Sequence, residues 1–251
     1  MLGWIILFSI FGSVFSTIGG VFLLLREKLT NRISLFLISF AAGVLLGVSF
    51  LDVIPEAMEN FSDPKDALLY VLAAIVFFFI VEKSFWWYHH HRFQSKEHRR
   101  ETEHHTLNKT DAYLLLVGDS IHNFVDGIVI AAAFLVDFPL GVGVAVGVVA
   151  HELPQEIADF SIMLRAGFSR KKVLILNLIT ALTTLLGALL AYFSLGAISF
   201  FIPPVLAIAG GIFIYLALSD LIPAIHHTSE HKYDFVHFIL FIAGIVLMAV
   251  L

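Results

Sequence analysis

The sequence contains no cysteine, so neither a disulfide framework nor thiolate ligation of a metal is available to it. Charged residues are also scarce. They make up 14% of the 251 residues, whereas 59% are hydrophobic, and soluble domains carry about 25% charged residues. The mean hydropathy is +0.92. The composition therefore predicts an integral membrane protein that lies in a lipid bilayer, has no nucleic-acid partner, and can bind a metal only through nitrogen and oxygen.

Long apolar runs of about 20 residues recur along the chain, which is the length that a helix needs to cross the hydrocarbon core. We predict an all-α integral membrane protein with eight transmembrane helices, formed as a single polytopic domain over residues 1–251. The predicted spans are Gly3–Leu25, Ile33–Ala57, Ala67–Tyr88, Asp111–Val136, Pro139–Ala166, Val173–Leu195, Ile202–Ile225 and Phe235–Leu251.

The basic residues predict the orientation of these spans. The loops after spans 1, 3, 5 and 7, together with their flanks, hold 14 of the 15 lysines and arginines, and only Lys65 lies elsewhere. Loops on the cytoplasmic side carry such an excess. We therefore expect both termini on the extracytoplasmic side of a plasma or inner membrane.

A short sequence repeat relates the two halves of the chain. Span 2 ends in Asp52-Val53-Ile54-Pro55, and span 7 ends in the related DLIP sequence at residues 220–223. With eight spans, these segments lie at opposite membrane faces, as in the inverted repeats of many secondary transporters. The predicted repeat relates helices 1–3 to helices 6–8 around a central pair, helices 4 and 5.

The central pair carries a cluster of ionisable residues, each costing roughly 2.5–3.5 kcal/mol at membrane depth on insertion scales. In span 4, Asp119, His122 and Asp126 share a helix face. Span 5 has a similar face and an adjoining stripe of carboxylates. Imidazole, carboxylate and amide groups on two facing helices indicate a divalent transition-metal site. The residues on the face of span 5 are His151, Gln155 and Asp159, and those in the stripe are Glu152 and Glu156.

Other polar residues are candidates for the pathway to and from this site. Asp52 and Glu56 could gather cations at the outer mouth, and Asp220 could line the inner exit. The alternative for these three is a carboxylate at a helix end that interacts only with water. Asn177 in span 6 is a further pathway candidate, as are Asp119 and Asp159 of the central pair.

One hydrophilic loop, residues 89–108, is long and rich in histidine. Such a tract is typical of weak, exchanging metal binding. The alternative is a solvated linker whose histidines do little. The candidates for loop metal binding are His89, His90, His91, His98, His104 and His105.

Two motifs of the central pair, HNFVDG at residues 122–127 and HELPQE at residues 151–156, resemble signature helices 4 and 5 of the ZIP (Zrt/Irt-like) metal-ion transporters. The continuation to residue 164 is similar to the branch of that family whose fifth helix reads H-E-x-P-H-E-x-G-D-F. Two departures are Gln155, where that branch has histidine, and Ala158, where it has glycine.

The resemblance implies transport of zinc, and often of iron, manganese or cadmium, toward the cytoplasm through a site between helices 4 and 5. The metal would then be the transported substrate, with no cofactor acting as a catalyst. The positions that match the family's metal site are His122, Asn123, Asp126, His151 and Glu152, and Gln155 and Glu156 complete the predicted set.

Two other functions use the same residues. An intramembrane zinc metalloprotease needs H-E-x-x-H, and Gln155 occupies its second histidine position. A metal sensor would bind without transport. The chain has no nucleotide-binding motif for a primary pump. We predict a transporter rather than an enzyme, and the sequence leaves the oligomeric state open, a homodimer included.

Overall fold

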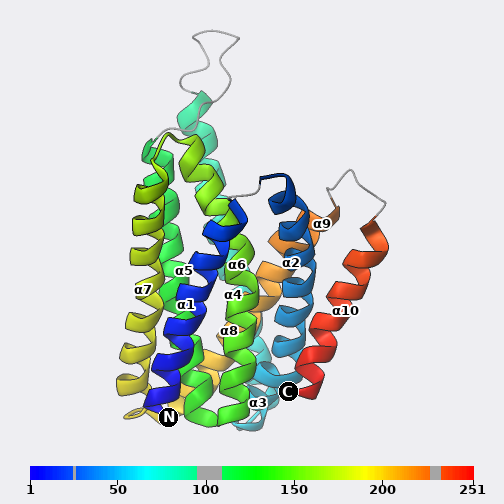
Figure 1. Cartoon of the computed structure of the whole chain (residues 1–251). Coiled ribbons are helices and arrows are strands. Elements are labelled where there is room, and N and C mark those ends of the chain that lie inside the picture. Colours follow the sequence, from blue (N-terminus) through cyan, green and yellow to red (C-terminus); the bar gives the residue numbers. More distant parts are fainter. Residues whose placement is uncertain (25–26, 95–108, 227–232) are drawn as a thin grey trace.

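The structure is a computed structural model that describes residues 1–24, 27–94, 109–226 and 233–251 (Figure 1). The side chains of residues 22–24, 27–32, 85–94 and 111 lie outside the described part. All the regular structure in these ranges is helical, without a strand. The predicted all-α class is therefore confirmed.

Each predicted span corresponds to a helix or to a short series of helices. Spans 1, 3, 4, 5, 6 and 8 are single helices. The third runs past the predicted end at Tyr88, so that the backbone of residues 89–94 is helical rather than looped. The six helices are α1 (Leu2–Leu24), α4 (Pro64–Gln94), α5 (Lys109–Val136), α6 (Phe138–Arg165), α7 (Arg170–Leu195) and α10 (Asp234–Val250).

Spans 2 and 7 are both interrupted by a π-helical segment, which the hydropathy of the sequence does not reveal. Span 2 consists of α2 (Glu27–Gly47), η1 (Val48–Val53) and α3 (Ile54–Glu59). Span 7 follows the short 3₁₀ turn η2 (Ser199–Phe201) and consists of α8 (Ile202–Leu216), η3 (Ala217–Leu221) and α9 (Ile222–His226). The π segments are the places where Asp52 and Asp220 lie, and π-bulges frequently mark functional sites.

Six of the helical stretches are long and apolar enough to cross a membrane by length and composition. The helix α6 is not among them, and it is the one that carries His151, Glu152 and Glu156. The helix α10 is apolar but shorter, with 17 residues. Both termini lie at the same end of the bundle (Figure 1), as an even number of crossings requires.

The packing of the helices follows the predicted inverted repeat. The third helix of the first half, α4, packs against α8 of the second half. Correspondingly, the third helix of the second half, α10, packs against α2 of the first half. Similarly, α1 packs against the central helix α6, while α7 packs against the central helix α5. The helices α3 and α9, which follow the two π segments, lie at opposite ends of the bundle (Figure 1). The fold thus confirms the repeat and the central position of α5 and α6.

Two short connections hold α5, α6 and α7 antiparallel. Only Asp137 separates α5 from α6, and its carboxylate caps α6 by accepting a hydrogen bond from Leu140 N at 2.8 Å. The turn between α6 and α7 contains Gly167 with a φ of +83°, a conformation that glycine adopts without steric cost. The two helices with the polar faces therefore run side by side along their length.

Glycines bring α5 into backbone contact with α7. A Cβ added at Gly127 would overlap the carbonyl oxygen of Thr184, and one at Gly187 would overlap that of Phe124. Small residues permit this close approach between membrane helices. The contact matters for the site because Thr184 faces Asn123, the neighbour of His122.

Candidate metal centre

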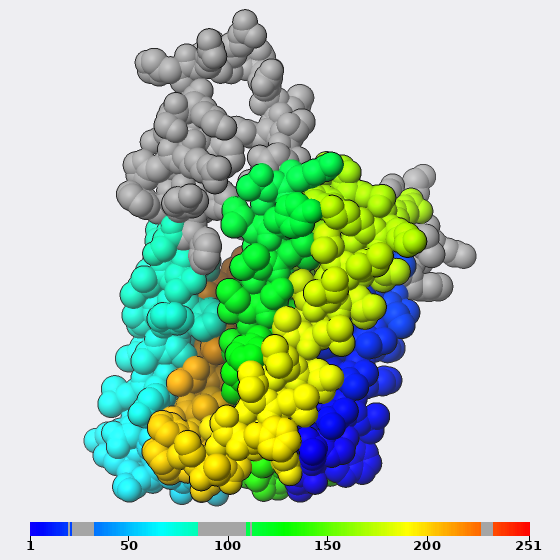
Figure 2. All heavy atoms as spheres, turned by 90° about the vertical axis from the view of Figure 1, so that its left-hand side faces the viewer, coloured from blue at the N-terminus to red at the C-terminus, as the bar shows by residue number. Residues whose placement is uncertain are grey.

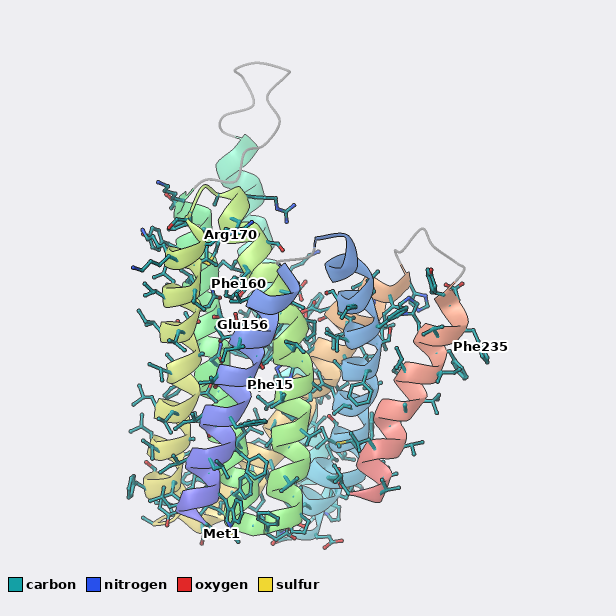
Figure 3. All side chains as sticks on the ribbon, viewed as in Figure 1. Met1, Phe15, Glu156, Phe160, Arg170 and Phe235 are labelled. Atoms are coloured by element: carbon teal, nitrogen blue, oxygen red, sulfur yellow. The ribbon has the colours of Figure 1, made fainter. Side chains whose placement is uncertain are left out.

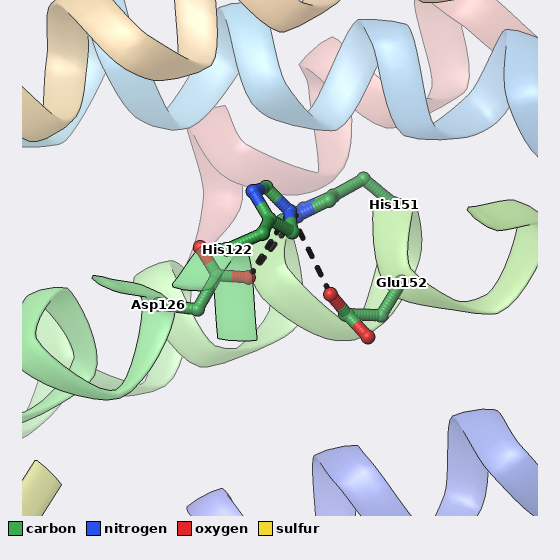
Figure 4. A group of neighbouring side chains, drawn as sticks. All are labelled: His122, Asp126, His151 and Glu152. Atoms are coloured by element: carbon green, nitrogen blue, oxygen red, sulfur yellow. Dashed lines mark hydrogen bonds and ion pairs between the residues drawn. The ribbon is translucent and has the colours of Figure 1, made fainter. Parts of the chain in front are cut away.

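Four side chains from α5 and α6 converge near the middle of the bundle (Figure 4). His122 and Asp126 come from α5, and His151 and Glu152 come from α6. One ligand atom from each lies within 4.8 Å of those from the other three. The spacing of the sequence explains this, because His122 and Asp126 are one helical turn apart and face the adjacent pair on α6.

The distances between these atoms suit a small cation. His122 Nε2 lies 3.0 Å from His151 Nε2, 3.6 Å from Glu152 Oε1 and 3.7 Å from Asp126 Oδ2. His151 Nε2 lies 3.2 Å from Asp126 Oδ2. Tetrahedral zinc with ligands at 2.0–2.1 Å places its ligand atoms about 3.3 Å apart. The four residues therefore need little movement to surround an ion.

Hydrogen bonding prepares His151 as a ligand. Its Nδ1 lies 2.9 Å from the carbonyl oxygen of Gly147, which can only accept, so that Nδ1 carries the proton and Nε2 is left to bind. Histidines that bind metals are commonly oriented in this way. Nε2 of His151 then meets Nε2 of His122 either through a proton that His122 donates or through a metal ion bound between them.

The two carboxylates of the cluster also lack partners. Asp126 Oδ2 and Glu152 Oε1 are buried, and neither has a hydrogen bond from any described residue. Buried oxygens without partners are costly. The side chains of Asp126, His151 and Glu152 are at most 4% exposed, whereas His122 is 18% exposed. The cluster therefore has the donor set and burial of a cation site, with His122 as its accessible member.

Three other predicted ligands lie next to this cluster without joining it. Asn123 donates through Nδ2 to Asp119 Oδ1 at 2.8 Å, and its Oδ1 accepts from Thr184 Oγ1 at 2.9 Å. Gln155 Oε1 is buried without a partner. Glu156 Oε1 accepts a hydrogen bond from Thr17 Oγ1 on α1 at 3.1 Å, and its Oε2 has no partner in the described chain.

A run of carboxylates continues from the cluster along α5 and α6. Asp119 lies within electrostatic range of both His122 and Asp126. Glu156 lies in range of Asp119 and Asp159. Glu156 lies on α6 toward the end of the bundle where that helix meets α7 (Figure 3). Asp119, Glu156 and Asp159 thus form a row of carboxyl side chains that begins at the cluster.

Asp220 also lies near His122. It belongs to η3, lies within electrostatic range of His122, and accepts a hydrogen bond from Ser219 Oγ at 3.0 Å. Nearby, the hydroxyl of Tyr215 donates to Glu82 Oε2 on α4. Figure 2 shows a groove between α4 and α5 with the orange residues of α8 at its floor. The sequence alone does not predict the contact between Glu82 and Tyr215, because it joins distant parts of the chain.

The remaining pathway candidates lie away from the four ligands. Asp52 is half-buried on η1, and its Oδ2 approaches Gly143 of α6. Glu56 on α3 accepts a hydrogen bond from Asn60 Nδ2 at 2.8 Å. Asn177 is fully buried and donates to Val173 O at 2.9 Å.

The histidines of the predicted loop are not placed relative to the site. His98, His104 and His105 lie outside the described residues, and so do the side chains of His89, His90 and His91.

Two threonines support the site from the helices that pack against it. Thr17 binds Glu156 from α1, and Thr184 binds Asn123 from α7. Each is a polar residue in an apolar helix, which is the only signal in the sequence. That signal is weak because a threonine usually bonds to the carbonyl of its own helix, as Thr17 also does with Ser13 O at 2.9 Å.

The sequence matches a known protein family. The model of the ZIP zinc transporter family matches residues 2–112 and 88–251. Zinc transporter ZIP4 of Mus musculus is 39% identical over 120 residues, covering 48% of this chain and 18% of that protein. Zinc transporter ZIP10 of Danio rerio is 35% identical over 136 residues, covering 51% of this chain and 16% of that protein.

Another relative has a broader name. Metal cation symporter ZIP14 of Xenopus tropicalis is 37% identical over 121 residues, which cover 48% of this chain and 26% of that protein. In each of these comparisons the match spans less than a third of the relative's length. The family model, in contrast, extends over almost all of the present sequence, and the chain therefore belongs to the ZIP zinc transporter family.

Proposed function

We propose that this chain transports divalent transition metals toward the cytoplasm, with zinc as the main substrate, through the site formed by His122, Asp126, His151 and Glu152. The observation that carries the proposal is the convergence of two imidazole nitrogens and two carboxylate oxygens within 4.8 Å in the interior of a membrane bundle. A cluster of this kind is costly in a membrane without a cation to balance it.

The donor set fits transport better than permanent binding. Structural zinc sites are closed tetrahedra, commonly rich in thiolate, and this chain has no cysteine. Imidazole suits zinc and iron(II), while carboxylate also suits manganese. We propose that iron(II), manganese and cadmium are secondary substrates. The exposure of His122 gives the ion a point of entry or departure without opening the rest of the cluster.

The surrounding carboxylates extend the site into a path. Asp52 and Glu56 lie on η1 and α3, at the end of the bundle opposite α9, and would attract cations there. Asp220, beside His122, would receive the ion on the other side. We propose that Asp119, Glu156 and Asp159 line the exit with carboxyl groups, so that the ion meets an oxygen ligand at each step.

Neither alternative accounts for the site as well as transport does. A metalloprotease would need a histidine at position 155, but Gln155 is there and lies outside the converging group of four. A sensor that does not transport has no need of a row of carboxyl groups that leads away from its metal site. We therefore propose a transporter without catalytic activity, formed by residues 1–251 as one polytopic domain.

Zinc accumulation by cells that express the chain tests this function. We expect radioactive zinc to enter faster than into cells that lack it, and excess unlabelled zinc to suppress the signal. Zinc binding to the isolated protein without any increase in cellular uptake would identify a sensor instead.

The orientation can be tested by labelling, because the chain contains no cysteine of its own. We expect a single cysteine introduced by Ser95→Cys to remain unlabelled by an impermeant thiol reagent in intact cells and to become labelled after permeabilisation. A cysteine at Ser62, between α3 and α4, should show the opposite result. Labelling of the Ser95 variant in intact cells would reverse the proposed topology.

The six histidines of the loop should not be needed for the transport cycle. Replacing His89, His90, His91, His98, His104 and His105 with serine is expected to change the apparent affinity or regulation of uptake while flux is retained. The measurement is zinc uptake as a function of concentration, normalised to inserted protein. Complete loss of uptake in correctly inserted protein would place the loop in the permeation path.

A further inference from the structure

A cavity lies between α9 and α10, apart from the α5–α6 centre. Its volume is about 470 Å³, and its walls include Ile222 from α9 and Phe238 and Phe241 from α10. Two histidines and one carboxylate interrupt this apolar lining, namely His226, Asp234 and His237. The proposed function uses none of the three.

His237 is the fixed element of the cavity. It is only 6% exposed, and its Nδ1 lies 2.7 Å from Ser39 Oγ on α2. The same hydroxyl donates to Leu35 O at 2.9 Å. Because a serine hydroxyl has one proton, both contacts are hydrogen bonds only if His237 Nδ1–H is the donor to Ser39. His237 therefore offers the cavity an Nε2 lone pair, for which the described residues supply no hydrogen-bond partner.

This arrangement repeats the preparation of His151 in the central cluster. There Nδ1–H is held by a carbonyl oxygen one turn earlier on the same helix, and Nε2 is likewise left as a ligand. An imidazole whose Nδ1–H donates a hydrogen bond in this way is oriented for metal binding through Nε2, and the hydrogen bond makes Nε2 more basic. The apolar walls around His237 would limit competition from water.

His226 and Asp234 can complete a ligand set. His226 ends α9 and Asp234 begins α10, and both side chains are exposed. Among the described residues, only the central four have ligand atoms that converge within 4.8 Å. We therefore propose that the cavity is a second transition-metal site, in which His226 and Asp234 turn toward the fixed Nε2 of His237 when an ion arrives. Two imidazoles and one carboxylate leave room for water as a further ligand, which suits zinc, cobalt(II) or iron(II).

The position of the site indicates what an ion there would do. The helix α9 follows η3 directly, and η3 carries Asp220, the proposed exit carboxylate. An ion bound to His226 on α9 and to His237 on α10 would link these helices and restrain η3. If the proposed transport function holds, ions that accumulate on the exit side bind here, join α9 to α10, and thereby slow further transport.

Cobalt(II) binding to the purified full-length chain tests the site itself and does not depend on transport. The starting protein carries His122→Ala and Asp126→Ala, which remove two of the four ligands of the central cluster. It also carries serine in place of the loop histidines and of His227 and His231. It is purified without a histidine tag. We expect equilibrium dialysis to show one bound cobalt per chain, with visible absorption bands characteristic of nitrogen and oxygen ligands.

Three variants of this protein distinguish the residues that bind the ion from Ser39, which only orients His237. His226→Ala removes an exposed side chain and should abolish the bound cobalt without disturbing the packing. His237→Gln should do the same. Ser39→Ala leaves every ligand in place but frees the ring, and should weaken binding roughly 10–100-fold, as is usual for loss of such a support. Ser84→Ala is its matched control, because Ser84 bonds only to Ile80 O of its own helix in the described chain.

The possible contrary results are distinct. Absence of bound cobalt in the starting protein would show that the cavity is not a metal site, and an unchanged stoichiometry and spectrum in the His226 and His237 variants would show that the ion binds elsewhere. If the site binds metal as expected, zinc loaded inside liposomes should slow uptake by the otherwise unmodified chain and not by its His226→Ala variant. Equal slowing of both would overturn the link to transport and leave the binding site intact.

Discussion

Replacing Asp126 with alanine is expected to abolish zinc uptake in cells while the protein still inserts into the membrane. The change removes the oxygen that lies 3.2 Å from His151 Nε2 and leaves only two histidines and Glu152 to hold the ion. His122→Ala should have the same effect, because His122 contacts the other three members of the cluster. The measurement is initial uptake, normalised to the amount of protein in the membrane.

Glu59→Ala is the matched control for Asp126→Ala. Glu59 is an exposed carboxylate at the end of α3, outside the cluster and outside the carboxylate path that leads from it. Its loss should leave uptake close to that of the unmodified chain. Substantial uptake by the Asp126 variant would mean that the converging group is not the substrate site.

Replacing Gln155 with histidine is expected to tighten zinc binding and to favour zinc over manganese and iron. Position 155 is one helical turn after His151 and on the same face, so a new imidazole would lie next to the existing ligands. Gln155 Oε1 is buried without a partner, which shows that the position is enclosed by the bundle. A gain of about 1.4 kcal/mol would lower the apparent dissociation constant tenfold.

Gln155→Glu provides the opposing test at the same position. A carboxylate oxygen suits harder ions better than an imidazole does, so that this variant should shift selectivity toward manganese. Competition between radioactive zinc and unlabelled manganese or iron measures both shifts in one assay. Unchanged selectivity in both variants would show that residue 155 does not contact the ion during transport.

The sequence predicted the location of the helices, and of the two helices that carry the polar cluster, because both depend on local patterns. Twenty apolar residues in succession need no tertiary information to be identified as a span. The four-residue spacing of His122 and Asp126 assigns them to one face of α5, whatever that face meets. The adjacent residues His151 and Glu152 could join them because a short turn brings α6 back along α5.

The sequence could not predict features that depend on helix geometry and rotation. A π segment and an α-helix have the same hydropathy, so the interruptions at Asp52 and Asp220 were not detected. The spacing of residues along a helix also does not determine which partner a side-chain amide will bond to. Asn123 neighbours His122 in the chain, yet the close approach of α7 at Gly127 lets Thr184 bind its oxygen. In the structure Asn123 therefore bonds to α7 instead of to the converging ligands.

The most direct measurement of the central claim uses purified protein in liposomes that enclose a fluorescent zinc indicator. With the unmodified chain as the only protein, external zinc should raise the internal signal at a rate that saturates with concentration, and liposomes with the Asp126→Ala variant should show only the leak of empty ones. Equal rates for the two proteins would contradict the account, because zinc would then cross the membrane without the cluster formed by His122, Asp126, His151 and Glu152.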